Sequence, residues 1–230
     1  MKTFFILLAT VVLLAGSGVM AQQDEGYQDE YRDILEAAIY GGLNMPMGGV
    51  SDWTTETPTG PIPFAPKTGF SLGGEFGYFA TPNIVTGVQF LYSQYAIDSD
   101  NEAASERHHR VFAPAVYLKY YFFGESNFVP YLKAHAGVDF LKFTTSVVND
   151  GEGGEFQYRE LSYDPAFAFG FGGGLFYYTH DYGGLFLEVN YHTALTDEVE
   201  GSFGSPKYVF GENLSYVEVH AGIKVFFGSE

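Results

Sequence analysis

Eight segments of the chain share one alternating pattern, in which one of the two faces contains no Asp, Glu, Lys or Arg. The last segment shows it best: the odd positions from Val217 to Phe227 are all apolar, whereas the even positions include Glu218, His220 and Lys224. A period of two residues is typical of a β-strand whose two faces meet different surroundings. The predicted strands cover residues 34–43, 69–79, 84–95, 111–122, 132–140, 166–177, 185–192 and 217–227.

The connections between these segments alternate between short and long. The short ones are residues 80–83, 124–128 and 179–183, and the long, polar ones are residues 44–68, 96–108, 146–164 and 194–214. Short turns at one rim and long loops at the other are typical of a transmembrane barrel with periplasmic turns and extracellular loops. The sequence therefore predicts an all-β, eight-stranded antiparallel up-and-down transmembrane barrel, with its apolar faces toward lipid. A soluble barrel such as a lipocalin, with its apolar face inward, is the alternative.

Composition excludes several other classes of protein. The 29 Gly oppose a helical bundle, because each Gly weakens a helix that contains it. The longest apolar block, Phe4 to Leu14, is too short to cross a membrane as a helix. Without Cys the chain has no disulfides and no thiolate metal sites, and a formal net charge of −17 opposes nucleic-acid binding.

The chain divides into four parts. Lys2, the apolar stretch Phe4 to Ala15 and the small-residue site Val19-Met20-Ala21 predict that residues 1–21 are a signal peptide, with a membrane anchor as the alternative. Residues 22–33 are then an acidic periplasmic lead, 34–227 the barrel and 228–230 a C-terminal extension. After export, such a barrel is expected in the cell outer membrane.

Aromatic residues gather where the predicted strands end, as they do at membrane interfaces. We expect two girdles at the two rims of the barrel. The residues beside the short turns are Phe79, Phe122, Phe123, Phe128, Tyr131, Tyr177, Tyr178, Phe226 and Phe227, and those near the long loops are Tyr92, Tyr95, Phe112, Phe143, Phe167, Tyr191 and Tyr216.

The final segment carries the sharpest resemblance to a known family. The run from His220 to Phe227 is similar to the final-strand signal read by the barrel-assembly machinery, with a polar His220, Gly222 two residues on, and Val225 and Phe227 at alternate places. Together with the architecture of residues 34–227, this resembles the small eight-stranded outer-membrane barrels of Gram-negative bacteria, of the OmpA, OmpX and OmpW type. The resemblance implies outer-membrane lipid, lipopolysaccharide and the assembly machinery as partners.

Six charged residues on the inward faces lie at about one level when positions are counted from the short-turn rim. They are Glu36, Glu75, Lys119, Lys133, Glu188 and Lys224. Eight strands leave an interior just wide enough for side chains, so we expect a neutral ion-pair belt there, with Lys224 facing Glu188. A structural polar plug is the expected role, and a gate or narrow pore whose ion pairs exchange is the alternative.

Two further features of the inward faces leave alternatives open. The inward residues of the sixth segment, from Ala166 to Gly174, are all small, so bulky neighbours fill that space or it is a cavity. His135, His192 and His220 also face inward, near Asp139 and Glu218. We expect hydrogen-bonded interior histidines, with a metal site as the alternative.

Acidic residues gather in three of the long connections. The acids lie within residues 98–106, 150–155 and 197–200 and are expected to be solvated, or else to bind divalent cations that bridge to lipopolysaccharide.

A barrel deacylase needs a His and a Ser two residues apart on one strand face, which neither His192 nor His220 provides.

The function expected from the sequence is that of a non-enzymatic outer-membrane barrel without a cofactor. It would have a plugged polar interior and a structural or cell-surface interaction role, with an extracellular partner that the sequence does not identify. A narrow pore or hydrophobic-solute channel, porin-like or OmpW-like, is the first alternative. A lipopolysaccharide-modifying barrel enzyme is the second.

Overall fold

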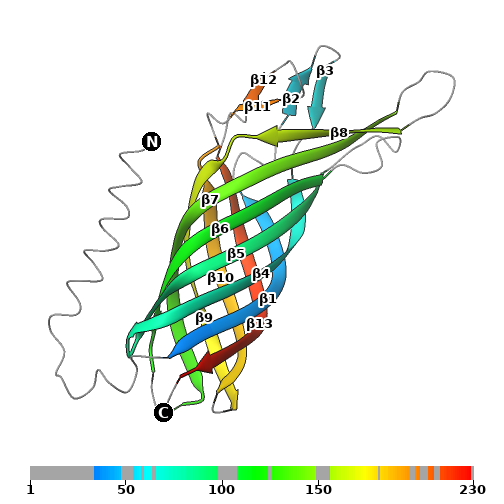
Figure 1. Cartoon of the computed structure of the whole chain (residues 1–230). Helices are drawn as coiled ribbons and strands as arrows, with labels where there is room; N and C mark the ends of the chain where they lie inside the picture. Colours follow the sequence, from blue (N-terminus) through cyan, green and yellow to red (C-terminus); the bar gives the residue numbers. More distant parts are fainter. Residues whose placement is uncertain are drawn as a thin grey trace, which may run out of the picture.

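Eight antiparallel strands close into a tilted barrel (Figure 1). The structure is a computed structural model, and it describes residues 34–47, 54–57, 60–63, 66–97, 108–123, 126–148, 156–180, 182–196, 200–202, 207–209 and 213–228. The predicted signal peptide, the acidic lead and nearly all of the acidic loop residues lie outside the described residues.

The barrel strands follow one another around the wall in chain order. They are β1 (Leu35–Met47), β4 (Pro66–Thr81), β5 (Ile84–Ile97), β6 (His108–Tyr121), β7 (Phe128–Val148), β9 (Ala166–His180), β10 (Gly183–Ala194) and β13 (Leu214–Phe227). The first and last strands pair from Leu35↔Phe227 to Met47↔Ser215, which closes the barrel and leaves no open edge among these eight strands. No helix in the described part of the chain is long and apolar enough to cross a membrane.

The two faces of each barrel strand differ in the way that the alternating pattern predicts. On β4, Leu72 is 64% exposed and Phe76 is 51% exposed, whereas the neighbouring Ser71 and Glu75 are buried. The apolar face points outward on all eight strands and the charged face points inward. A soluble barrel would have the opposite arrangement. The predicted fold class, a transmembrane β-barrel, is therefore confirmed.

The short turns are fixed by polar side chains next to them. Thr81 Oγ1 accepts a hydrogen bond from the backbone N–H of Ile84 across the turn at Pro82 and Asn83. The Asn83 side chain then donates to the carbonyl of Tyr121 on the neighbouring strand, at 2.8 Å. The turn is thus attached to β6 as well as to its own strands.

Five short strands among the described residues lie within the long connections, and the sequence analysis did not predict them. They are β2 (Thr54–Thr57), β3 (Gly60–Pro63), β8 (Phe156–Tyr163), β11 (Glu200–Ser202) and β12 (Lys207–Val209). The end of β7 pairs with β8, and β11 and β12 follow, so one sheet continues past the barrel wall. Figure 1 shows these strands at the end opposite the C-terminus.

The predicted aromatic girdles are only partly correct. Phe122, Phe128, Tyr177, Phe227 and other members of the two sets are exposed on the outer surface. Five other members point inward and are buried: Phe79, Tyr95, Tyr131, Phe143 and Tyr216. The reason is that neighbouring residues of a strand point to opposite faces, so proximity to a rim does not by itself place a ring in lipid.

Candidate functional site

The six predicted belt residues meet inside the barrel, although they come from six different strands. Lys224, Glu36, Lys119, Glu75, Lys133 and Glu188 form, in that order, a chain of alternating charge. Every member is buried. We call this chain the ion-pair belt.

The middle of the belt is held by short contacts. Lys119 Nζ lies 2.6 Å from Glu36 Oε1 and 2.6 Å from Glu75 Oε2. Lys133 Nζ lies 2.9 Å from Glu188 Oε1 and 3.5 Å from Glu75 Oε2. Glu75 is therefore shared between two lysines, and the positive and negative charges of the belt balance.

Tyrosines and one amide complete the polar contacts of the belt. Tyr121 donates a hydrogen bond to Glu36, and Tyr131 donates one to Glu188 at 2.8 Å. Asn190 donates to the same carboxylate of Glu188 at 2.6 Å. Tyr131 bonds to Glu188 Oε2, the oxygen that Lys133 leaves free, whereas Asn190 shares Glu188 Oε1 with Lys133. A buried ion pair needs such additional hydrogen bonds for stability. Tyr121 lies two residues after Lys119 and therefore on the same, inward face of its strand.

The expected pairing of Lys224 with Glu188 is wrong. Lys224 Nζ lies 3.6 Å from Glu36 Oε2 and donates a hydrogen bond to Tyr121 at 2.5 Å. The residue on β13 that stands opposite Glu188 in the register is His220. Counting from the rim ignored the stagger between tilted strands, which displaces positions of equal count along the barrel axis.

Side chains fill the interior at the level of the belt. Tyr40, Phe176 and Phe186 are buried there, and the Lys224 ammonium lies over the rings of Tyr131 and Phe186 at 4.5 and 4.9 Å. The small residues of β9 make room for this packing. A Cβ atom at Gly170 would lie 2.5 Å from the His135 ring, and one at Gly174 would lie 2.5 Å from the Tyr131 hydroxyl. Bulky neighbours fill this space.

A second polar layer lies above the belt, toward the long loops. His192 Nε2 lies 2.9 Å from Asp139 Oδ2, and His192 Nδ1 lies 3.0 Å from His135 Nε2. The His192 ring also stacks on Tyr216 at 4.6 Å. All four side chains are buried. We call these residues the histidine cluster.

The third inward histidine, His220, bonds to a different strand. His220 Nε2 lies 2.9 Å from Ser71 Oγ, and its Nδ1 lies 4.0 Å from Glu218 Oε2. This order resembles the serine, histidine and acid of a hydrolase. However, the Ser71 hydroxyl donates to Asn44 Oδ1 at 3.1 Å, so His220 has to donate to Ser71 and cannot act as its base. All of these groups are also buried.

The metal alternative finds no preformed site in the described residues. Across those ranges, no three His, Cys, Asp or Glu side chains are grouped so that they could hold a metal ion. Ring nitrogens of His135 and His192 bond to each other, His192 also bonds to Asp139, and His220 bonds to Ser71.

The residues of the predicted assembly signal lie on both faces of β13. His220 points inward and is buried, whereas Val225 and Phe227 lie on the outer face. Gly222 lies between them against the first strand, where a Cβ atom would come within 2.3 Å of the carbonyl oxygen of Ile39. Only a residue without a side chain fits this close approach of β13 to β1.

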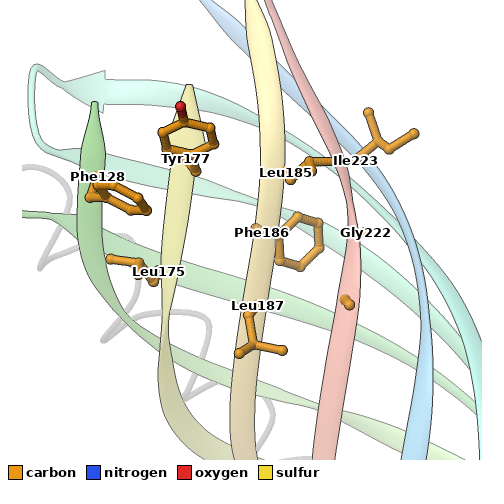
Figure 2. Close-up of a pocket in the computed structure, with 9 residues that line it drawn as sticks. Phe128, Leu175, Tyr177, Leu185, Phe186, Leu187, Gly222 and Ile223 are labelled. Atoms are coloured by element: carbon orange, nitrogen blue, oxygen red, sulfur yellow. The ribbon is translucent and has the colours of Figure 1, made fainter. Parts of the chain in front are cut away.

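An apolar groove lies on the outer wall between β7, β9, β10 and β13 (Figure 2). Leu175, Leu185, Leu187 and Ile223 are exposed along it, and Phe128 and Tyr177 lie at its end near the short turns. The groove opens on the lipid face, and its lining also includes Phe186, whose side chain is buried.

An outward apolar wall, a closed ring of strands and buried interior charges define the class of protein: a small eight-stranded transmembrane β-barrel. No family model matches the chain. No curated protein matches it either.

Solved structures of outer-membrane barrels do match the fold. The outer membrane protein OprG from Pseudomonas aeruginosa is 13% identical, with a TM-score of 0.51, and the match covers 86% of this chain and 97% of OprG. The attachment invasion locus protein Ail of Yersinia pestis, in complex with the heparin analogue sucrose octasulfate, is 13% identical over 83% of this chain and 98% of Ail, with a TM-score of 0.48. Neisserial surface protein A is 16% identical over 84% and 97%, with a TM-score of 0.46. The resemblance to small outer-membrane barrels is thus confirmed for the fold.

Proposed function

We propose that this protein is an outer-membrane barrel with a sealed interior and a structural or cell-surface interaction role. The observation that carries the proposal is the filling of the interior. The belt, the histidine cluster and the rings of Tyr40, Phe176 and Phe186 are all buried between the strands. A barrel of eight strands has little room beyond its own side chains, so solutes larger than water would need these groups to move.

The proposed location rests on the fold together with the first residues of the chain. A barrel with this lipid-facing wall is the structure that outer-membrane proteins use, and residues 1–21 have the composition of an export signal. With export, the short turns face the periplasm, and the sheet of β7, β8, β11 and β12 extends from the cell surface. Lipid, lipopolysaccharide and the assembly machinery are then partners, and this outer sheet is the proposed contact for an extracellular partner.

We also propose that the protein is not an enzyme. The arrangement nearest to a catalytic one, Ser71 with His220 and Glu218, has its hydroxyl proton directed to Asn44. Its atoms are buried inside the barrel, so an acyl chain or a sugar could reach them only if the surrounding side chains moved. Incubation with lipopolysaccharide and phospholipid should yield no shortened product, and the Ser71→Ala variant should behave like the parent protein.

A narrow pore is the second candidate, and one observation favours it. Glu75 Oε2 contacts both Lys119, at 2.6 Å, and Lys133, at 3.5 Å. Since one carboxylate serves two lysines, the pairs can exchange partners without leaving a charge alone. Such an exchange would open a path only if the tyrosines around it moved as well.

Conductance in planar bilayers separates the two candidates. The sealed interior predicts no steady current from purified protein, and brief openings at most. As a control, Tyr131→Ala removes an interior ring and should raise the conductance, whereas Leu132→Ala on the lipid face of the same strand should not. Steady ion flow through the parent protein would contradict the sealed interior and favour the pore.

A further inference from the structure

Acids outnumber lysines inside the barrel. Among the described buried residues there are five acids, Glu36, Glu75, Asp139, Glu188 and Glu218, but only three lysines. The belt pairs three of those acids with all three lysines. Asp139 and Glu218 are therefore left without a lysine, and both are almost completely buried.

Each of these two acids faces a histidine. Asp139 lies 2.9 Å from His192, and Glu218 lies 4.0 Å from His220. One oxygen of each acid, Asp139 Oδ1 and Glu218 Oε1, is buried and accepts no hydrogen bond. A buried carboxylate in this state is strongly unfavourable as an anion unless a positive charge or a proton compensates it.

The surrounding groups do not supply that compensation. The titratable groups that face His192 are Asp139 and His135 on β7, together with Tyr216 and Glu218 on β13. Those that face His220 are Glu218 on its own strand, Glu188 on β10, Glu75 on β4, Lys133 and His135 on β7, and Tyr40 on β1. Tyr95 on β5 faces both Asp139 and Glu218. Lys133 is already engaged by Glu188 and Glu75.

We propose that the outer half of the barrel interior is a proton-binding site, which holds one proton in the Asp139–His192–His135 cluster and one in the Glu218–His220 pair. In the first cluster the proton can lie on either side of the 2.9 Å contact, and His135 accepts or donates along the 3.0 Å contact accordingly. In the second, His220 Nε2 keeps its hydrogen for Ser71, so the extra proton binds either His220 Nδ1, a buried nitrogen without a hydrogen-bond partner, or the Glu218 carboxylate 4.0 Å away.

The proposal fixes the sign of the pH dependence. In the unfolded chain, histidine loses its proton near pH 6.5 and the acids near pH 4. Between pH 7 and pH 9 the unfolded chain therefore lacks both protons that the barrel holds. Because the folded state binds more protons, its stability falls as the pH rises. For each proton that only the folded state holds, the equilibrium constant for unfolding changes about tenfold per pH unit. Two such protons change it about a hundredfold per pH unit.

Proton uptake on folding tests the proposal directly. Unfolded protein would be folded into uncharged lipid vesicles in weak buffer at pH 8, with a pH indicator dye. We expect uptake of about two protons per chain, about one for Asp139→Asn or Glu218→Gln, and none for the double variant. Both substitutions keep the shape of the side chain while removing the need for a proton.

Two control variants separate the proposed effect from a general effect of removing an acid. Asp164→Asn changes an exposed acid and should leave the uptake at two. Glu188→Gln combined with Lys133→Met removes both members of a buried ion pair, so it leaves no charge uncompensated and should leave the uptake at two. In urea unfolding from pH 7 to pH 9, the free energy of unfolding should fall less steeply with pH for Asp139→Asn and for Glu218→Gln than for the parent protein.

Two results would overturn the proposal. The first is uptake of no protons by the parent protein, with equal pH slopes for all variants. The second is stabilisation of the parent protein, but not of the double variant, by added Na⁺ or Ca²⁺ at constant pH. In that case a metal cation, and not a proton, would compensate Asp139 and Glu218.

Discussion

Removing one partner of the Lys133–Glu188 pair should be far more damaging than removing both. The contact is 2.9 Å long and both side chains are at most 1% exposed. At this distance, an effective dielectric constant of 20 corresponds to an attraction on the order of 6 kcal/mol. Lys133→Met leaves Glu188 with its bonds from Tyr131 and Asn190 but without a cation. Breaking a buried pair typically costs about 3–5 kcal/mol, and the two remaining bonds favour the lower end, about 3 kcal/mol.

The double variant Lys133→Met with Glu188→Gln should recover about 2 kcal/mol of that loss, because no charge is then left unpaired. Urea unfolding in lipid vesicles, followed by the gel mobility of unheated samples, gives the four free energies of the cycle. Lys133→Met combined with Val88→Ala on the outer face of β5 is the control, and it should be additive within about 0.5 kcal/mol. If the cycle for Lys133 and Glu188 is equally additive, the two residues are not paired and the description of the belt fails.

Four further predictions test the wall, the packing, the assembly signal and the orientation. Leu187→Arg places a cation in lipid and should cost about 2–4 kcal/mol in urea unfolding; no loss would mean that the lipid face is assigned wrongly. Gly174→Ala should destabilise the barrel by about 1–3 kcal/mol because its Cβ would lie 2.5 Å from the Leu187 carbonyl oxygen, whereas Gly41→Ala, with 3.4 Å to its nearest neighbour, should be tolerated. Phe227→Ala should lower the amount of barrel inserted in cells more than it lowers the stability of the purified protein; equal losses would count against a role in assembly. Protease added to intact cells should cut within residues 150–155 and spare the turn at Pro82, and the reverse pattern would invert the topology.

Which face of each strand meets lipid could be predicted from the sequence, because the alternation of apolar and polar residues lies within the strand itself. Leu72 and Glu75 differ in parity, and parity alone decides which of them meets lipid. Membership of the belt followed from the same rule together with the level counted from the short-turn rim, since Asp139 and Glu218 share the inward parity but lie outside the belt. The contrast between short and long connections predicts the orientation of the barrel in the membrane, which the protease experiment tests.

The pairing within the interior depends on strands that are far apart in the sequence. Ser71 and His220 are separated by 149 residues, and only the stagger of the closed barrel brings them to 2.9 Å. The same stagger moves Lys224 from Glu188 to Glu36. The strands β2, β3, β11 and β12 have only three or four residues each, which is too short for an alternating pattern to be recognised.

The Lys224–Glu36 contact has a consequence for how the barrel is made. Lys224 lies on the last strand to be synthesised and Glu36 on the first, so this end of the belt can form only when β13 reaches β1. Before that contact forms, the charged groups of Lys224 and Glu36, which are buried in the complete barrel, lie on either side of the gap between β1 and β13, here called the seam. Desolvating either of them alone is costly, so insertion into lipid and closure of the seam should proceed as one step. Half-built barrels that retain water at this seam are the assembly intermediates to expect.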